Sequence, residues 1–419
     1  MKSIEHYVLL LCICSLLSAC SSNAGKAKEE STIDTCSISN QEPKEEIVPL
    51  KPVERNAVLY LDCSVSMKGY INTTTDATFN NVISSLLYWM PTTAHLFDTK
   101  EQTGISRNDF IDKINTRKIS WSDESDLAKM IASMIKKVNE ENIGISYLIT
   151  DGIMSGSNQE IKDSPARSFN IKSRGTLTKR IAYAVSTCKE DIAILLIKYT
   201  SNFTGEYYCY TNEKVYLKES KRPFYVVAVG NRGLVKELME RTQKEPLLSN
   251  SQGILLLGDE YPYDMHLTAD HREGITYSKD GEIAIGSIFK SDDFVFFNGN
   301  LSNFPEYMRS SNYFEKNAEV YIQYLQKGGY KKLDSQYISY EVNGENIEIG
   351  VQAKCIKRNA LYLKLKYELP DWIESSSIDD DKNINLPIPK TFNFKYFVGG
   401  LNNINSEEFI NKIDTLKFK

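Results

Sequence analysis

The stretch "AVLYLDCSVSMKGY" (residues 57–70) decides how the first half of this chain is interpreted. Its apolar run at residues 57–61 predicts a buried strand. Asp62, Ser64 and Ser66 then occupy alternate positions where the strand gives way to a loop. A second apolar run, "ISYLIT" (residues 145–150), leads directly into Asp151. Both runs therefore place polar side chains at the carboxyl end of a predicted strand.

Short apolar runs alternate with helical ones over most of the first half. Beyond the two strands above, the patterns predict strands at residues 192–199 and 224–230 and helices at residues 79–90, 126–142, 177–188 and 233–243. Such alternation is typical of an α/β fold with a doubly wound, mostly parallel sheet covered on both faces. Residues 200–221 interrupt it with alternating aromatic and polar residues, which predict a β-hairpin extension.

The polar residues at the strand ends predict a metal site. In open α/β sheets, ligands bind at the carboxyl ends of the strands, where Asp62, Ser64, Ser66 and Asp151 all fall. Ser125 opens a predicted helix between them and can point into the same crevice. Carboxylate and hydroxyl oxygens suit a hard divalent cation, magnesium first and manganese or calcium as alternatives.

This residue set resembles the metal-ion-dependent adhesion site of von Willebrand factor type A (vWA) domains. The family has D-x-S-x-S in its first loop and an aspartate, commonly within T-D-G, in its third; here these are residues 62–66 and 150–152. The resemblance covers about residues 56–250. It implies that Ser64 and Ser66 bind the ion directly, while Asp62 and Asp151 act partly through water. In the second loop Ser125 stands where the family has threonine, and Ser122 and Asp123 are alternatives.

The N-terminus resembles that of a bacterial lipoprotein. A short charged start, an apolar stretch at residues 7–17 and "LSAC" (residues 17–20) match the lipobox, which implies cleavage after residue 19 and lipidation of Cys20. Residues 20–54 are polar and charged, and we interpret them as a flexible tether. In Gram-negative lipoproteins, serine after the lipidated cysteine is similar to an outer-membrane signal, and acidic runs such as residues 28–30 resemble surface-export tags.

The second half has strand-like patterns instead of helical ones. We expect residues 55–250 to form the vWA-like domain and residues 251–419 a smaller all-β, sandwich-like domain. Asn343 and Gly344 predict a type I′ hairpin turn, "TFNFKYFVGG" (residues 391–400) predicts a strand, and residues 406–418 predict a short helix. The acidic run at residues 378–383 is interpreted as a solvated loop.

Other features narrow the functional class. A net charge of −5 argues against a nucleic-acid partner. The sequence has no catalytic-triad or phosphate-loop pattern that would predict an enzyme or a small-molecule substrate. The spacing of His266 and His271 matches no common zinc motif. The cysteines suggest no disulfide framework, although Cys188 and Cys209 could pair in an oxidising compartment.

These observations lead to one functional hypothesis and one alternative. The first is a lipoprotein anchored to the outer membrane, on its periplasmic or outer face, that binds a protein partner whose carboxylate completes the coordination of the ion. The alternative is a structural scaffold of a cell-envelope complex, in which the ion only makes the loops rigid.

Overall fold

The computed structural model describes two long stretches and several shorter ones. The long stretches are residues 53–153 without 99 and 103, and residues 166–258 without 210–212. The shorter ones are residues 267–269, 275–277, 283–285, 290, 292–405 without 303, 325–329, 357–358 and 383–388, then 409–410 and 416–417. Predictions for the signal peptide, Cys20, the tether up to residue 52, His266 and His271 fall outside the described residues.

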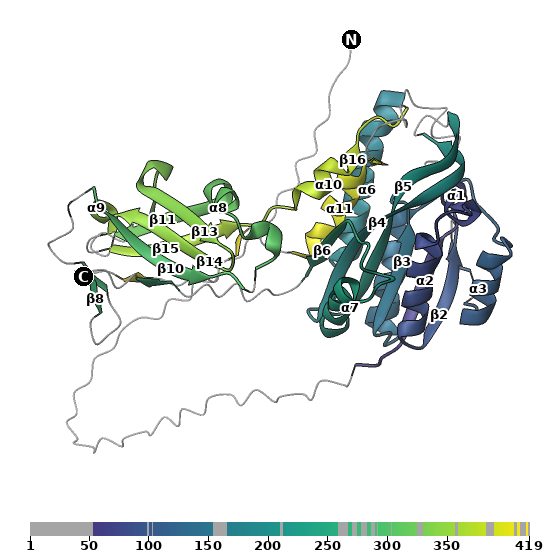
Figure 1. The fold of residues 1–419 in the computed structure, drawn as a ribbon, viewed down its shortest axis with the longest axis horizontal. Helices are drawn as coiled ribbons and strands as arrows, with labels where there is room; N and C mark the ends of the chain where they lie inside the picture. Colours follow the sequence, from purple (N-terminus) through teal and green to yellow (C-terminus); the bar gives the residue numbers. More distant parts are fainter. Residues whose placement is uncertain are drawn as a thin grey trace, which may run out of the picture. The chain divides into compact units, whose positions relative to one another are not determined.

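The first half is built around a six-stranded sheet (Figure 1). Its strands are β1 (Ala57–Asp62), β2 (Thr92–Phe97), β3 (Ile145–Thr150), β4 (Ile192–Tyr208), β5 (Lys214–Asn231) and β6 (Gly253–Leu257). They lie in the order β2-β1-β3-β5-β4-β6. The pairings show that β1 to β4 run in one direction, whereas β5 and β6 run in the other. The expectation of a mixed α/β protein with a mostly parallel sheet is confirmed.

A long hairpin explains why β5 runs opposite to both of its neighbours in the sheet, β3 and β4. β4 and β5 are paired from Ile192↔Asn231 to Tyr208↔Lys214, with a register shift between Phe203 and Gly205. The predicted hairpin extension is therefore confirmed. The strands predicted on either side of it, at residues 192–199 and 224–230, are the continuation of its two arms. Strands joined by so short a connection must be antiparallel, because a parallel return needs a crossover of a dozen residues or more.

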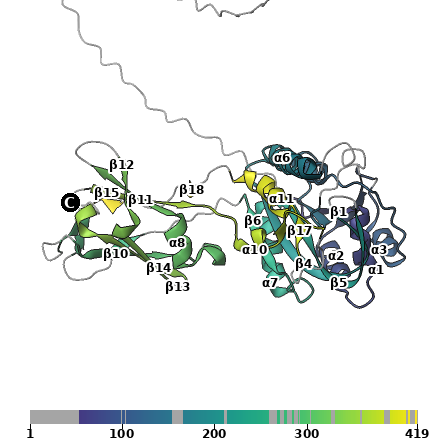
Figure 2. The same ribbon diagram turned by 90° about the horizontal axis from the view of Figure 1, so that it is seen from above.

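Helices cover both faces of this sheet. Figure 2 shows α6 (Ala166–Val185) and α11 (Phe394–Leu401) on one side, and α2 (Thr78–Trp89) and α7 (Arg232–Lys244) on the other. The first face also carries α4 (Leu127–Glu140), and the second face α1 (Lys68–Asn72) and α3 (Arg107–Asn115). The doubly wound arrangement predicted from the alternation of strands and helices is therefore present.

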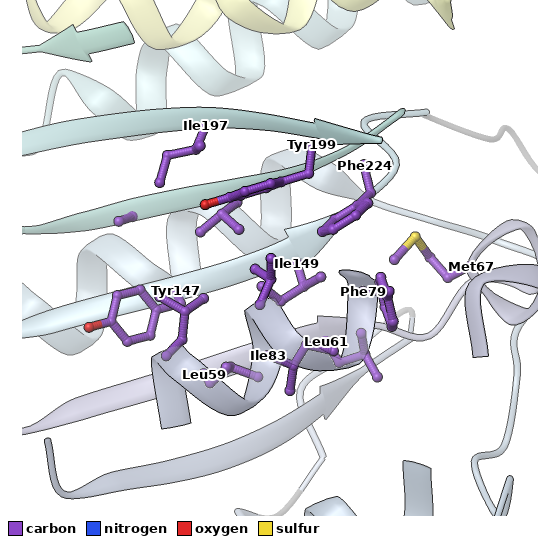
Figure 3. Close-up of a cluster of buried hydrophobic side chains, with 14 of the residues drawn as sticks. Leu59, Leu61, Met67, Phe79, Ile83, Tyr147, Ile149, Ile197, Tyr199 and Phe224 are labelled. Atoms are coloured by element: carbon purple, nitrogen blue, oxygen red, sulfur yellow. The ribbon is translucent and has the colours of Figure 1, made fainter. Parts of the chain in front are cut away.

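Each face has its own core, as the alternation of side chains along the strands requires. Leu59 and Leu61 of β1 pack with Ile149 of β3 against Phe79 and Ile83 of α2 (Figure 3). The side chains between them point to the opposite face, where α4, α6 and α11 cover them. This double coverage is why β1 and β3 are mostly apolar and fully buried, and why the polar side chains of the candidate site appear at their carboxyl ends.

The second half contains two antiparallel sheets around one core. The first has the order β13-β14-β10-β7, formed by Ile338–Asn343, Asn346–Gln352, Phe294–Asn300 and Thr268–Ala269. The second has the order β12-β11-β15-β18, formed by Tyr330–Lys332, Ala318–Tyr324, Asn359–Lys366 and Phe409–Ile410. Val295, Phe297, Val320 and Leu363 share one buried cluster, as expected for a sandwich-like unit.

The predicted type I′ turn is corrected. β13 and β14 do form a hairpin, but Asn343 pairs with Asn346, so Gly344 and Glu345 are the turn residues. Gly344 has a φ of +63°, whereas Glu345 is absent from the residues with positive φ. A type I′ turn needs positive φ at both central positions. The turn therefore begins one residue later than the Asn-Gly pair predicts, and Gly344 is the first of its two central residues instead of the second.

The C-terminal segment returns to the first half, which corrects the predicted boundary at residue 251. β6 belongs to the six-stranded sheet, and α10 (Asp371–Ser375), β16 (Ser377–Ile378), β17 (Thr391–Phe392) and α11 follow the second half of the chain. The predicted strand at residues 391–400 is mostly α11. Phe394, Phe397, Val398 and Leu401 follow helical spacing and are fully buried in the core of the α/β sheet.

Two smaller points complete the fold. The described parts of the predicted C-terminal helix are short strands, β18 and β19 (Leu416–Lys417), which both pair with β15. None of the helices that the structure describes is long and apolar enough to cross a membrane.

Candidate metal centre

The five predicted site residues lie together at one end of the sheet. β1 and β3 are parallel neighbours, so Asp62 and Asp151 follow adjacent strand ends. Ser125 lies just before α4, and its hydroxyl lies 3.2 Å from an Asp62 carboxylate oxygen. All except Ser66 are buried; Asp62 is 0% exposed and Asp151 2%. The geometry expected from the strand ends is therefore present, whereas ion binding itself stays a prediction.

Asp62 is held by three neighbours. Its Oδ1 accepts a hydrogen bond from the Ser64 backbone N–H at 3.0 Å. Its Oδ2 accepts from the Thr150 hydroxyl at 2.8 Å and from the Ser125 hydroxyl at 3.2 Å. Burial nevertheless raises the pKa of Asp62 above its usual range, because the hydrogen bonds compensate the lost hydration only in part. A buried carboxylate fixed in this way orients the loop around it.

Ser64 and Ser66 present a pair of hydroxyl oxygens 2.9 Å apart. Adjacent ligands of an octahedral magnesium ion, each about 2.05 Å from the metal, are separated by about 2.9 Å. The same spacing also fits a hydrogen bond between the two hydroxyls, in which either oxygen donates. The pair is therefore arranged to be bridged by a proton or by a small cation without moving the backbone.

Asp151 directly follows β3, and its carboxyl group is buried and perturbed by its neighbours. Its Oδ1 accepts a hydrogen bond from the Ile153 N–H at 3.0 Å, across a turn in which Gly152 has a φ of +73°. Burial, followed by the nearby Asp62 carboxylate, raises the pKa of Asp151 to about 7. Two buried carboxylates that repel each other are the kind of group that a cation stabilises.

The structure favours one of the three alternatives in the second loop. Ser125 is 3% exposed and reaches Asp62, whereas Asp123 is exposed. The Ser122 hydroxyl accepts from the Glu124 N–H at 3.2 Å, and its backbone pairs with the Ser64 loop through Cys63 and Val65. Ser122 thus joins the two loops, and Ser125 supplies the hydroxyl inside the site.

Several residues around the site were not predicted from the sequence. The Thr391 hydroxyl of β17 donates to the Asp151 carbonyl at 3.4 Å and accepts from the Tyr225 hydroxyl at 3.0 Å. Asp381, expected in a solvated loop, is 2% exposed and accepts a hydrogen bond from the Tyr207 hydroxyl at 2.6 Å. These contacts join segments far apart in the chain, so no local pattern signals them.

The donor set fits a small hard cation. Among the described residues, no three His, Cys, Asp or Glu side chains gather as a metal cluster, so an ion here would rely on hydroxyl oxygens beside two carboxylates. Such ligands suit magnesium, manganese or calcium and are poor ligands for zinc. The spacing of the hydroxyl pair and the burial of both carboxylates are the two observations that support this fit.

Comparison with known proteins identifies no relative. No protein-family model matches the chain, and no curated protein matches it.

Among the cysteines, Cys188 is a free thiol, so the bridge to Cys209 that we considered is not formed.

Proposed function

We propose that this protein is a lipid-anchored, vWA-like binding protein that captures a protein partner through a divalent cation. The observation that supports this most is the convergence of two buried carboxylates and three serine hydroxyls at adjacent strand ends. The order of D-x-S-x-S after β1 and T-D-G after β3 agrees with the vWA pattern. The antiparallel hairpin β4–β5 departs from the mostly parallel order that we expected for such a domain.

The residues would share the work of holding an ion. Ser64 and Ser66 would be direct ligands, and Ser125 the ligand of the second loop. Asp62, fixed by its three hydrogen bonds, would orient this set, and Asp151 would face it from β3. A bound divalent cation would supply an electrophilic centre that accepts one further oxygen. Only two carboxylates neutralise it, and the more accessible position of Ser66 marks the side open to a partner's carboxylate.

Ser66→Ala tests the proposal. The variant loses one direct ligand from a half-buried position, so its fold should persist while its affinity for magnesium falls at least about tenfold, a change of roughly 1.4 kcal/mol. Partner capture from envelope extracts should fail for this variant, and for the wild type in chelator. Ser84→Ala on α2 is the matched control and should capture the partner as the wild type does. Wild-type capture that persists in chelator would contradict the adhesive role.

The burial of the site favours a second candidate. Ser64, Ser125 and both aspartates are each no more than 3% exposed, which is also what a purely structural ion requires. In that scaffold role, chelation should lower the melting temperature while partner binding at stoichiometric protein concentrations continues. The same pull-down therefore separates the two candidates, because only the adhesive role makes capture depend on the ion.

The anchoring part of the proposal has its own test. We expect Cys20 to carry the lipid, which holds the chain at the outer membrane, on its periplasmic or outer face. Several acyl chains together make a stable anchor, since each buried methylene adds roughly 0.8 kcal/mol. Metabolic labelling with a fatty-acid analogue should mark the wild type and leave Cys20→Ala unlabelled; label retained by the variant would refute lipidation at this residue.

A further inference from the structure

Arg222 is a buried cation beside the candidate metal centre. It is 6% exposed and lies on β5 three residues before Tyr225, which pairs with Thr150 at the end of β3. Side chains alternate along a strand, so Arg222 shares a face with Phe224 and Val226. Asp151 continues the same face of β3 after Ile149. The adjacent strands therefore project a guanidinium and a carboxylate to one side of the sheet, just beyond the end of β3.

A chain of contacts fixes the position of this guanidinium. Its central carbon lies 4.3 Å from the centroid of the Tyr207 ring. Tyr207 in turn donates its hydroxyl to Asp381 at 2.6 Å, and both residues are almost fully buried. No ion pair joins Arg222 to a carboxylate in the part of the chain that the structure describes. Its charge is therefore held in place by a ring and is not neutralised by direct contact.

We infer that Arg222 is an affinity-setting residue: its fixed positive charge weakens the hold of the Asp62–Asp151 pair on a divalent cation. The inference rests on the proposed ion site. The physical reason is that two cations attracted to the same carboxylate repel each other across a buried, poorly screened region. Asp381, on the far side of Tyr207, opposes this effect because it partly offsets the guanidinium charge.

The consequence is a site that favours an anionic partner group. An ion held weakly by the chain alone keeps more of its attraction for a carboxylate from outside. By linkage, a carboxylate that binds better in the presence of the ion must raise the affinity for the ion by the same factor. Arg222 would thus make occupancy by the ion depend on the partner.

The test measures manganese binding by calorimetric titration at one mildly alkaline pH, with full-length protein. Arg222→Met removes the charge while keeping a long apolar side chain, and should tighten manganese binding about tenfold or more. Arg222→Lys should stay close to the wild type. Asp381→Asn keeps an acceptor for Tyr207 but removes the compensating charge, and should weaken binding several-fold. Lys221→Met, one residue away and exposed, is the matched control and should change little.

The outcomes separate this inference from the proposed function. No manganese binding by the wild type would overturn both. If the wild type binds manganese and Arg222→Met binds it equally or more weakly, the inference alone is overturned. Removing an arginine with a purely structural role can only weaken manganese binding, whereas removing a repelling charge should strengthen it. If Arg222→Met does not fold, Asp381→Asn decides: unchanged or tighter binding would contradict the electrostatic role.

Discussion

Replacing Asp151 with alanine should weaken magnesium and manganese binding at least about a hundredfold, or roughly 2.7 kcal/mol. The crevice keeps the hydroxyls of Ser64, Ser66 and Ser125 but loses one of its two carboxylates, which provide most of the attraction for a dication. Calorimetric titration measures the loss. Undiminished binding by the variant would show that the residues after β1 and β3 only cap loops and strand ends.

The same variant should lose no more than about 1 kcal/mol of unfolding free energy without metal, and can gain stability. The pKa of Asp151 is raised in the folded state, so the folded protein binds more protons than the unfolded chain and metal-free stability falls as the pH rises towards 7 and beyond. Asp151→Ala removes this contribution. Thermal melts in chelator should therefore show that, as the pH rises from mildly acidic to neutral, the variant loses less stability than the wild type.

Phe394→Ala should destabilise the α/β half by about 3–5 kcal/mol, the usual cost of removing a buried aromatic ring. Phe394 is fully buried in α11 and stacks on Tyr225 of β5 with ring centroids 4.1 Å apart. Its removal leaves a cavity beneath the loop that carries Asp151, because Gly152 also lies against this pair of rings. Denaturant unfolding monitored by circular dichroism measures the effect.

Tyr183→Ala is the matched control for this variant. Tyr183 is also an aromatic residue on a helix of the same face, but it is 77% exposed, so its loss should change the free energy of unfolding by about 0.5 kcal/mol or less. Equal effects of the two substitutions would mean that the C-terminal segment does not belong to the core of the six-stranded sheet.

The strand ends of the first half could be predicted from the sequence because their information is local. The apolar runs of β1 and β3 are each buried on both sides and stop abruptly at Asp62 and Asp151. Parallel pairing of the two strands then brings the two polar ends together without further specification. The helices that cover these strands can also be predicted locally, from apolar residues at helical spacing.

What the sequence did not reveal depends on long-range partners. The aromatic residues at residues 391–400 favour a strand, although the apolar positions also fit a helix. The packing of Phe394 on Tyr225 decides in favour of the helix. Asp381 is in an acidic run that would be solvated in isolation, but in the folded protein it is buried and accepts a hydrogen bond from Tyr207, a residue far away in the sequence. Arg222 has no local motif, since its neighbours come from the other arm of the hairpin.

The return of the C-terminal segment imposes an order on folding. β6 ends at Leu257, but α11, which completes one face of the same sheet, begins only at Phe394. All residues between them must leave the ribosome before that face is covered. Contacts between segments so far apart in the sequence are slow to form. Until then Tyr225, Ile181 and the underside of the Asp151 loop are uncovered, so a nascent chain already containing all six strands is still vulnerable to proteases and to aggregation.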